Sequence, residues 1–406
     1  MNAIGRRTFL GAGLAATVLA RTLAALQAAP RRVKGVIWLW MGGGMSQWET
    51  WDPKPGTKVG GALKAIDTAV PGIQLSEFLP VCASQMKHLS IIRTMAHREG
   101  DSERATHLMH TGVAPGGEEI PSIGTIVSFE LAKPGFPLPS HVAIDPPVLP
   151  QSAVLGEDHQ PFRVNNSPWN PIPNLRRNVD SQRDRERAVL VLEQNKEWGA
   201  LRQQPEVRRL ETGFARSEAV MNTPLLKAFN WPEEPEALRK DYGGRFGENC
   251  LLARRLVQAG CAFVEIGMGG WNQRSDFPGA LKRMIPDLDR GLGTLVKDLS
   301  GKDLLRDVVV VCATEFGKTP DLNGGAGRDR WARGFSVVLA GGALAGGRVH
   351  GSTGAEGREC APPVSPQDFL ATVYKACGID PDKEYPIEEG RTMKYAQGGK
   401  PVAELF

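Results

Sequence analysis

Polar residues that could do chemistry gather at three places where an apolar run of the sequence ends. The first is MGGGMSQWETWDPKP, residues 41–55, in which three glycines follow the apolar residues 34–41. Consecutive glycines let backbone N–H groups point outward and form a cradle for an anion. Ser46 comes next, where a nucleophilic hydroxyl could be presented, with Glu49 and Asp52 close by. A glycine turn with a helix-capping serine explains the stretch equally well.

The second place is GGWNQRSDF, residues 269–277, after the apolar run CAFVEIGM. Asn272 and Arg274 stand where a metal site would use Asp and His. The Asn272 amide can donate to an oxyanion, and the Arg274 guanidinium can bind one through two hydrogen bonds. Neither group usually holds zinc, so the stretch indicates anion binding rather than metal binding.

The third place, residues 314–342, carries the densest charge. Glu315 ends an apolar run, and the segment GRDRW places Arg328, Asp329 and Arg330 before the next run. An acid at one strand end and an acid between two arginines predict either a charged binding site or an ion-paired loop. The candidate catalytic groups of the three places are Ser46, Glu315 and Asp329.

The spacing of the apolar residues predicts the elements that position these loops. Short runs rich in Val and Ile are typical of buried parallel strands, and they cover residues 34–41, 89–95, 141–144, 261–268, 307–315 and 335–342. Helical spacing covers residues 245–260, 276–301 and 365–378. The predicted fold class is therefore α/β, with a mostly parallel sheet between helical layers. Ligands of such sheets bind beyond the carboxyl ends of the strands, so the three loops converge if the strand order permits.

Length and composition indicate one large domain. The chain has 406 residues, of which 41% are hydrophobic, and we expect residues 30–406 to form that domain. Residues 176–245 are expected to form a mainly helical insertion, because interleaved Arg, Glu and Gln are typical of solvated helices. Lysine and arginine number 49 against 45 acids, a balance that gives no reason to expect a nucleic-acid partner. The six cysteines lack zinc-binding spacing and are expected to be buried thiols, with disulfides as the alternative after export.

The first 29 residues predict a twin-arginine export signal. Arg6 and Arg7 precede a mildly apolar stretch, and Ala28 or Ala29 before Pro30 offers a cleavage point. The apolar stretch is about half the length that a bilayer crossing needs. The mature protein is therefore expected to be periplasmic or extracellular, without a transmembrane span.

Four histidines leave a site elsewhere open. His107 and His110 are three residues apart in THLMHTG and share a helical face, while His97 and His141 lie near predicted strands. Core or surface histidines on ordinary elements are the simpler interpretation.

The order of these loops resembles that of the alkaline phosphatase superfamily, which includes the sulfatases. The resemblance implies a two-metal centre with ligands after one strand and before the next, at EFG (315–317) and GRDRW (327–331). More closely, the chain resembles the exported family called domain of unknown function 1501, in stretches such as VIWLWMGGGMSQWETWDPKP, REGDSERATHLMHTG, RFGENCLLARRLVQAG and DFLATVYKACGIDP. That family implies a fold but no established reaction.

Departures from the family pattern affect the implied metal ligands most. Relatives typically have Asp and His where this chain has Asn272 and Arg274, and His where it has Arg330. They often carry Asp at Glu49 and His at Ser102, and Phe316 replaces the histidine of the superfamily. A two-metal centre needs several anionic or imidazole ligands for each ion, and an arginine in that shell repels the metal.

These substitutions predict an arginine-lined anion-binding pocket, with no cofactor expected. Its ligand-binding residues would be Gly43, Gly44, Ser46, Asn272, Arg274, Arg328 and Arg330, with Glu315 and Asp329 holding the arginines in place. The ligand would be an anionic small molecule, a sulfated or phosphorylated glycan, or a partner protein. Two alternatives stay open: an active phosphate- or sulfate-ester hydrolase with Ser46 as nucleophile, and one Ca²⁺ or Mg²⁺ held by Glu49, Asp52 and Asp329.

Overall fold

The computed structural model describes residues 32–406 apart from 117–118, 147–153, 273–276, 388–389 and most of 165–216. A central sheet has eight strands: β1 (Gly35–Trp40), β4 (Leu89–Met95), β5 (His141–Ile144), β6 (Phe162–Val164), β9 (Phe263–Gly267), β10 (Val308–Ala313), β13 (Phe335–Gly341) and β14 (Arg348–His350). Their order across the sheet is β14-β4-β13-β10-β1-β9-β5-β6. The pairs are parallel except where β13 meets β10 and β4. The predicted α/β class with a mostly parallel sheet is confirmed.

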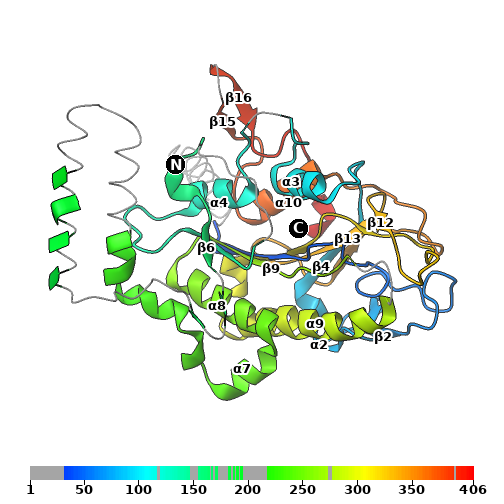
Figure 1. Cartoon of the computed structure of the whole chain (residues 1–406). Helices are drawn as coiled ribbons and strands as arrows, with labels where there is room; N and C mark the ends of the chain where they lie inside the picture. The colour runs from blue at the N-terminus through cyan, green and yellow to red at the C-terminus, as the bar shows by residue number, and fades with distance from the viewer. Residues whose placement is uncertain are drawn as a thin grey trace, which may run out of the picture.

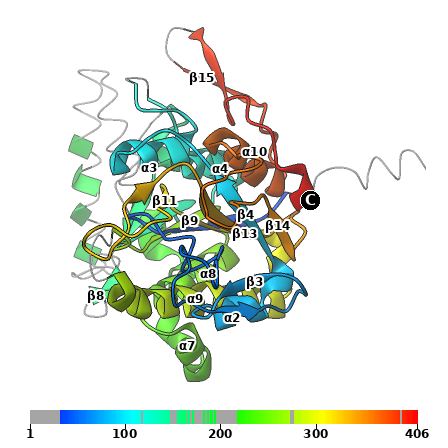
Figure 2. The ribbon, with the colours of Figure 1, turned by 90° about the vertical axis from the view of Figure 1, so that its right-hand side faces the viewer.

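Helices cover both faces of the sheet (Figures 1 and 2). One layer contains α2 (Pro80–Ser84), α7 (Glu236–Tyr242), α8 (Arg245–Ala259) and α9 (Phe277–Gly301). The other contains α3 (Ser102–Thr111), α4 (Ile123–Leu131) and α10 (Pro366–Ala376). Each layer encloses its own apolar core against the sheet.

Strand β1 shows why the sequence is continuously apolar here. Its side chains alternate between the two cores, with Ile37 and Leu39 in one and Trp38 and Trp40 in the other. Because helices cover both faces, every residue of β1 is buried. The strand therefore carries no polar position that would mark an exposed side.

Local sequence determines where the predicted helices end. Gly260 closes α8 in the left-handed conformation, with φ of 119°. Ser365 and Asp368 form a capping box at the start of α10. Both helices and α9 lie where the apolar spacing predicts them.

Short hairpins and turns complete the structure. The paired short strands are β2 (Ala65–Asp67) with β3 (Gln74–Ser76), β7 (Asn166–Ser167) with β8 (Asn170–Pro171), β11 (Gly317–Lys318) with β12 (Arg330–Trp331), and β15 (Glu384–Pro386) with β16 (Thr392–Lys394). The predicted export signal and much of the predicted insertion at 176–245 lie outside the described residues. Within the described ranges no helix has the length and apolar character of a membrane span. The six cysteines are free, and all but the half-buried Cys360 are buried.

Candidate functional site

The three candidate loops leave the sheet side by side. β1 lies between β10 and β9, both parallel to it, and Trp40 is in register with Ala313 and Gly267. Just beyond, the Gly42 N–H donates to the Met268 carbonyl at 3.0 Å. The predicted convergence at the carboxyl ends of the strands is confirmed for residues 41–46, 314–318 and 268–272.

The triglycine loop is shaped by close contact with the other two loops. Gly43 and Gly44 have φ of 114° and 89°, values that favour glycine. A Cβ on Gly43 would lie 2.5 Å from the Asn272 backbone nitrogen, and one on Gly44 would lie 2.7 Å from the Phe316 ring. The Gly43 N–H donates to Oε1 of Glu315 at 2.8 Å. The chain's own carboxylate therefore takes the donor that was expected to face a ligand.

Glu315 is buried and held by several neutral donors. The same Oε1 accepts a 2.7 Å hydrogen bond from the hydroxyl of Ser102, the first residue of α3. The Thr314 hydroxyl lies 3.3 Å from Oε2. Glu315 was expected to hold an arginine in place; its described contacts instead fix the glycine loop and the start of α3.

His97 fixes the backbone of Glu315. Its Nδ1 accepts a hydrogen bond from the Glu99 N–H at 3.1 Å, so the proton lies on Nε2, which donates to the Glu315 carbonyl at 2.6 Å. Burial lowers the pKa of His97. The His97 ring is therefore neutral, and its hydrogen bond holds the backbone at the end of this strand in place.

Lys318 is a buried cation that the sequence analysis missed. Its Nζ donates to the Gly43 carbonyl at 3.1 Å and would lie 3.4 Å from a Cβ on Gly44. The residue comes two positions after Phe316 on β11. The available sequence signal was a lysine three residues after the end of an apolar run, where its charge comes close to the core. Lysine is rarely fully buried without a partner, so such a position indicates a specific contact.

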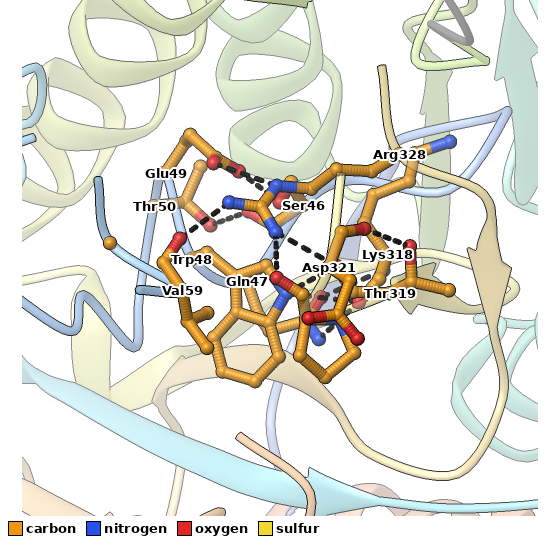
Figure 3. A network of polar contacts seen from close by, with 12 residues as sticks. Ser46, Gln47, Trp48, Glu49, Thr50, Val59, Lys318, Thr319, Asp321 and Arg328 are labelled. Carbon is orange, nitrogen blue, oxygen red and sulfur yellow. Dashed lines mark hydrogen bonds and ion pairs between the residues drawn. The ribbon is translucent and has the colours of Figure 1, made fainter. Parts of the chain in front are cut away.

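Ser46, Glu49 and Arg328 form a buried polar network (Figure 3). The Ser46 hydroxyl donates to Glu49, and the residue is only 1% exposed. Arg328 Nε lies 3.2 Å from the other carboxylate oxygen of Glu49. Burial raises the pKa of Glu49, while Arg328 and the Ser46 hydroxyl oppose that rise. The Ser46 hydroxyl is thus directed into the protein rather than presented at the surface.

Arg328 joins two distant loops. Its guanidinium also donates to the carbonyls of Thr319, Pro320 and Val59, at 2.9, 2.5 and 2.6 Å. Arg328 is only 4% exposed, and its guanidinium forms these hydrogen bonds inside the protein. It was expected to contact a ligand, whereas these contacts make it a structural cation.

Arg330 is held differently from Arg328. It is half-buried on β12, with its guanidinium 5.1 Å from the centre of the Phe316 ring. Nη1 donates to the Gly100 carbonyl at 3.3 Å, close in sequence to Ser102. Its Nε is buried and has no hydrogen-bond acceptor within the described part of the chain. Arg330 is therefore a cation with incomplete hydrogen bonding beside the Glu315 site.

Each acid of the alternative one-cation site has partners of its own. Asp52 contacts Lys54 at 3.0 Å and Arg93 at 3.3 Å. Asp329 is exposed, and its carboxylate accepts a hydrogen bond from Asn323 at 3.3 Å. Asp329 was also expected to hold the neighbouring arginines; its described contacts are with Asn323 and Thr319.

The acids at these strand ends contact hydrogen-bond donors and an arginine. Glu315 accepts hydrogen bonds, Glu49 pairs with an arginine, and Arg330 places a positive charge beside Phe316. Among the described residues, no group of three or more His, Cys, Asp or Glu side chains could hold a metal ion. Asn272 is exposed beside Gly43, and Arg274 lies outside the described residues.

Of the other three candidate histidines, His110 and His141 are buried and His107 is half-buried. His110 Nε2 contacts Oε1 of buried Glu265 at 3.1 Å, and His107 Nδ1 lies 2.9 Å from the Val113 carbonyl. Burial lowers the pKa of His141 to about 4. The simpler interpretation, ordinary histidines on helices and strands, agrees with these contacts.

Solved structures of sulfatases and alkaline phosphatases resemble the chain at low identity. A sulfatase from Pseudoalteromonas sp. has 12% identity and a TM-score of 0.42, with 88% of this chain and 70% of the sulfatase covered. A protein in the alkaline phosphatase superfamily from Vibrio parahaemolyticus has 9% identity and a TM-score of 0.40, with 93% and 71% covered. Alkaline phosphatase from the Antarctic bacterium TAB5 has 12% and 0.34, with 77% and 92% covered. At these TM-scores no residue role is carried over.

Comparisons of sequence give one further finding. The model of a family described as a protein of unknown function, DUF1501, matches residues 33–406. No curated protein matches the chain.

Proposed function

The chain belongs to the DUF1501 family, and from that premise we propose that it binds an anionic group beside Arg330 without using a two-metal centre. The observation that carries the proposal is the incomplete hydrogen bonding of Arg330 next to a strand end whose carboxylates already have partners.

The proposal depends on what each acid already does. Glu315 accepts the Gly43 N–H and the Ser102 hydroxyl, and Glu49 is paired with Arg328. Holding divalent ions would require these groups to give up their donors, and it would place the ions near Arg330. An arginine beside the strand end instead favours an anion.

Arg330 has the donors that a phosphate, sulfate or carboxylate group needs. One N–H is used by the Gly100 carbonyl. Among the described residues the buried Nε–H has no acceptor, which costs about 1–3 kcal/mol. An anion whose oxygen accepts a hydrogen bond from this guanidinium would offset part of the free energy that the unsatisfied donor costs. The exposed Asn272 amide is a second donor at the same edge.

The test is a calorimetric titration of inorganic sulfate and phosphate into the parent protein and Arg330→Ala. We expect the substitution to weaken binding by at least about tenfold, because a hydrogen-bonded charge contributes roughly 1.5–3 kcal/mol. Arg330→Lys keeps the charge but loses the planar donors, and should fall between the two. Arg348→Ala, on the exposed edge strand β14, is the matched control. Equal affinities for the parent and Arg330→Ala would refute the site.

A second candidate function is hydrolysis of phosphate or sulfate esters. The hydrogen bond from Ser46 to Glu49 favours it, because a carboxylate can accept the proton of an attacking hydroxyl. Ser46 is buried, so this function requires its loop to open. Turnover of 4-nitrophenyl phosphate or sulfate by the parent, lost in Ser46→Ala, would support hydrolysis. Turnover that survives Ser46→Ala would exclude Ser46 as the nucleophile.

The proposed location is outside the cytoplasm, by the twin-arginine route. Arg6 and Arg7 at the start of the chain support it. Cell fractionation of the full chain and of Arg6→Lys, Arg7→Lys should find the variant retained in the cytoplasm. Equal export of both would contradict this route.

A further inference from the structure

Two chain segments lie side by side next to Arg330. Residues 96–100 follow β4, and residues 330–334 contain β12. The His97 N–H donates to the Ala332 carbonyl at 2.8 Å, and Arg330 Nη1 donates to the Gly100 carbonyl at 3.3 Å. The Gln47 amide donates to the Gly334 carbonyl at 2.9 Å, which connects residues 330–334 to the segment that follows the triglycine loop. We call the exposed side of residues 96–100 and 330–334 this surface.

The two segments expose arginines without carboxylate partners. Arg98 and Arg333 are exposed, and neither forms an ion pair with a described residue. Nearby arginines behave differently: Arg104 pairs with Glu99 at 2.9 Å, and Arg358 pairs with Asp321. Arg98 and Arg333 are therefore available to an external anion.

An aromatic ring accompanies these cations. The Arg333 guanidinium lies 5.8 Å from the centre of the Trp331 ring, and Trp331 is half-buried. Stacking of this kind holds the guanidinium in a defined position and leaves its N–H edges for hydrogen bonding. A partly exposed indole also offers an apolar face to a sugar ring.

Acidic side chains near this surface have other partners. Glu99 is engaged by Arg104. Asp101 accepts the backbone N–H groups of Glu103 and Arg104 at the start of α3 and also interacts electrostatically with Arg330. Asp329 accepts a hydrogen bond from Asn323. These acids reduce the net charge of the surface but do not neutralise Arg98 or Arg333 directly.

We propose that Arg98, Trp331 and Arg333 form a second anion subsite, and that the ligand is an acidic polysaccharide whose charged groups reach both this subsite and Arg330. The inference rests on the anion binding proposed for Arg330. Exposed arginines accompanied by an aromatic side chain suit a polymer with repeated anionic groups and sugar rings between them. The near balance of 49 basic against 45 acidic residues argues against a nucleic acid, which is usually bound by a strongly basic face.

The test compares three probes by calorimetry at low ionic strength: inorganic sulfate, neutral dextran, and dextran sulfate of the same chain length. The parent should bind dextran sulfate at least about tenfold more tightly than inorganic sulfate, because a second engaged subsite raises the effective concentration. Dextran without charge should not bind. The double variant Arg98→Ala, Arg333→Ala should lose most of this advantage and retain the inorganic sulfate site that Arg330→Ala removes. For this variant, the slope of log affinity against log salt concentration should become shallower by roughly one to two.

A matched control removes the same charge elsewhere. Lys240→Ala, Lys297→Ala takes two exposed lysines from α7 and α9 and should bind dextran sulfate like the parent. If inorganic sulfate does not bind, the Arg330 site itself is wrong. If inorganic sulfate binds, but the arginine variant and the lysine variant have the same affinity for dextran sulfate, the second subsite is wrong. If a single-stranded oligonucleotide of equal charge binds as tightly as dextran sulfate, and is weakened equally by the arginine variant, the polysaccharide assignment is overturned.

Discussion

Replacing Arg328 by methionine should be among the most destabilising single changes near the site. Methionine keeps much of the length of the side chain but removes its donors. The Val59, Thr319 and Pro320 carbonyls lose the guanidinium, and buried Glu49 loses its cation. Removing one member of a buried charge pair costs about 3–5 kcal/mol. The loss should also loosen the contact between residues 46–59 and 317–330.

Glu49→Gln should behave differently, because burial raises the pKa of Glu49. A raised carboxyl pKa means that the folded state binds the proton more tightly than the unfolded state does. The parent is therefore most stable relative to the variant below about pH 4.5, and its relative stability falls as pH rises through the folded pKa. Gln resembles the protonated acid, so the stability of the variant relative to the parent should increase as pH rises from 4.5 to 7.5.

Urea unfolding followed by tryptophan fluorescence measures both effects, since the chain has nine tryptophans. With a slope of about 3 kcal/mol per molar, Arg328→Met should lower the midpoint by at least about 1 M. Asp321 lies on the same loop as Arg328 and forms an exposed ion pair with Arg358. Asp321→Asn breaks that pair and should lower the free energy of unfolding by less than about 1 kcal/mol. If Arg328→Met costs no more than Asp321→Asn, or if Glu49→Gln becomes less stable relative to the parent as pH rises from 4.5 to 7.5, the description of this network is wrong.

Two further predictions test other parts of the structure. Gly44→Ala should cost about 2–4 kcal/mol of unfolding free energy and weaken sulfate binding, because its Cβ meets the Phe316 ring that supports Arg330. Gly56→Ala has a similar φ but open space around it, so urea unfolding should show only the smaller backbone cost; equal losses in the two variants would contradict this account. Burial lowers the pKa of His141 to about 4, so the stability from its neutral ring is complete above about pH 6.5 and falls by about 3 kcal/mol as pH drops to 4. The free energy of unfolding of His141→Asn should depend less on pH across that range; an unchanged dependence would show that His141 does not contribute it.

The fold was more predictable from the sequence than the site. Apolar runs identified the strands of the central sheet around β1, and Gly260 and Ser365 marked helix ends, because these patterns reflect local periodicity and capping. The meeting of three loops followed from the rule that parallel strands share a carboxyl edge. Each of these inferences needs only residues close in sequence or a general rule of topology.

The detailed contacts were not predictable in the same way. Glu49 pairs with Arg328 across 279 residues, and Gly43 donates to Glu315 across 272. Nothing local distinguishes Arg328, whose donors are used internally, from Arg330, which keeps an N–H without an acceptor. The sequence allowed Ser46 to be a nucleophile or a helix cap, and it did not show that the Ser46 hydroxyl donates to Glu49.

The central claim is that an anion binds here without a metal centre. The most direct measurement is a calorimetric titration of inorganic phosphate into the protein before and after stripping with a chelator, with metal content measured in both samples. We expect the phosphate site that Arg330→Ala removes to have the same affinity in both samples. Binding that disappears on stripping and returns when zinc, manganese or calcium is added back would contradict it.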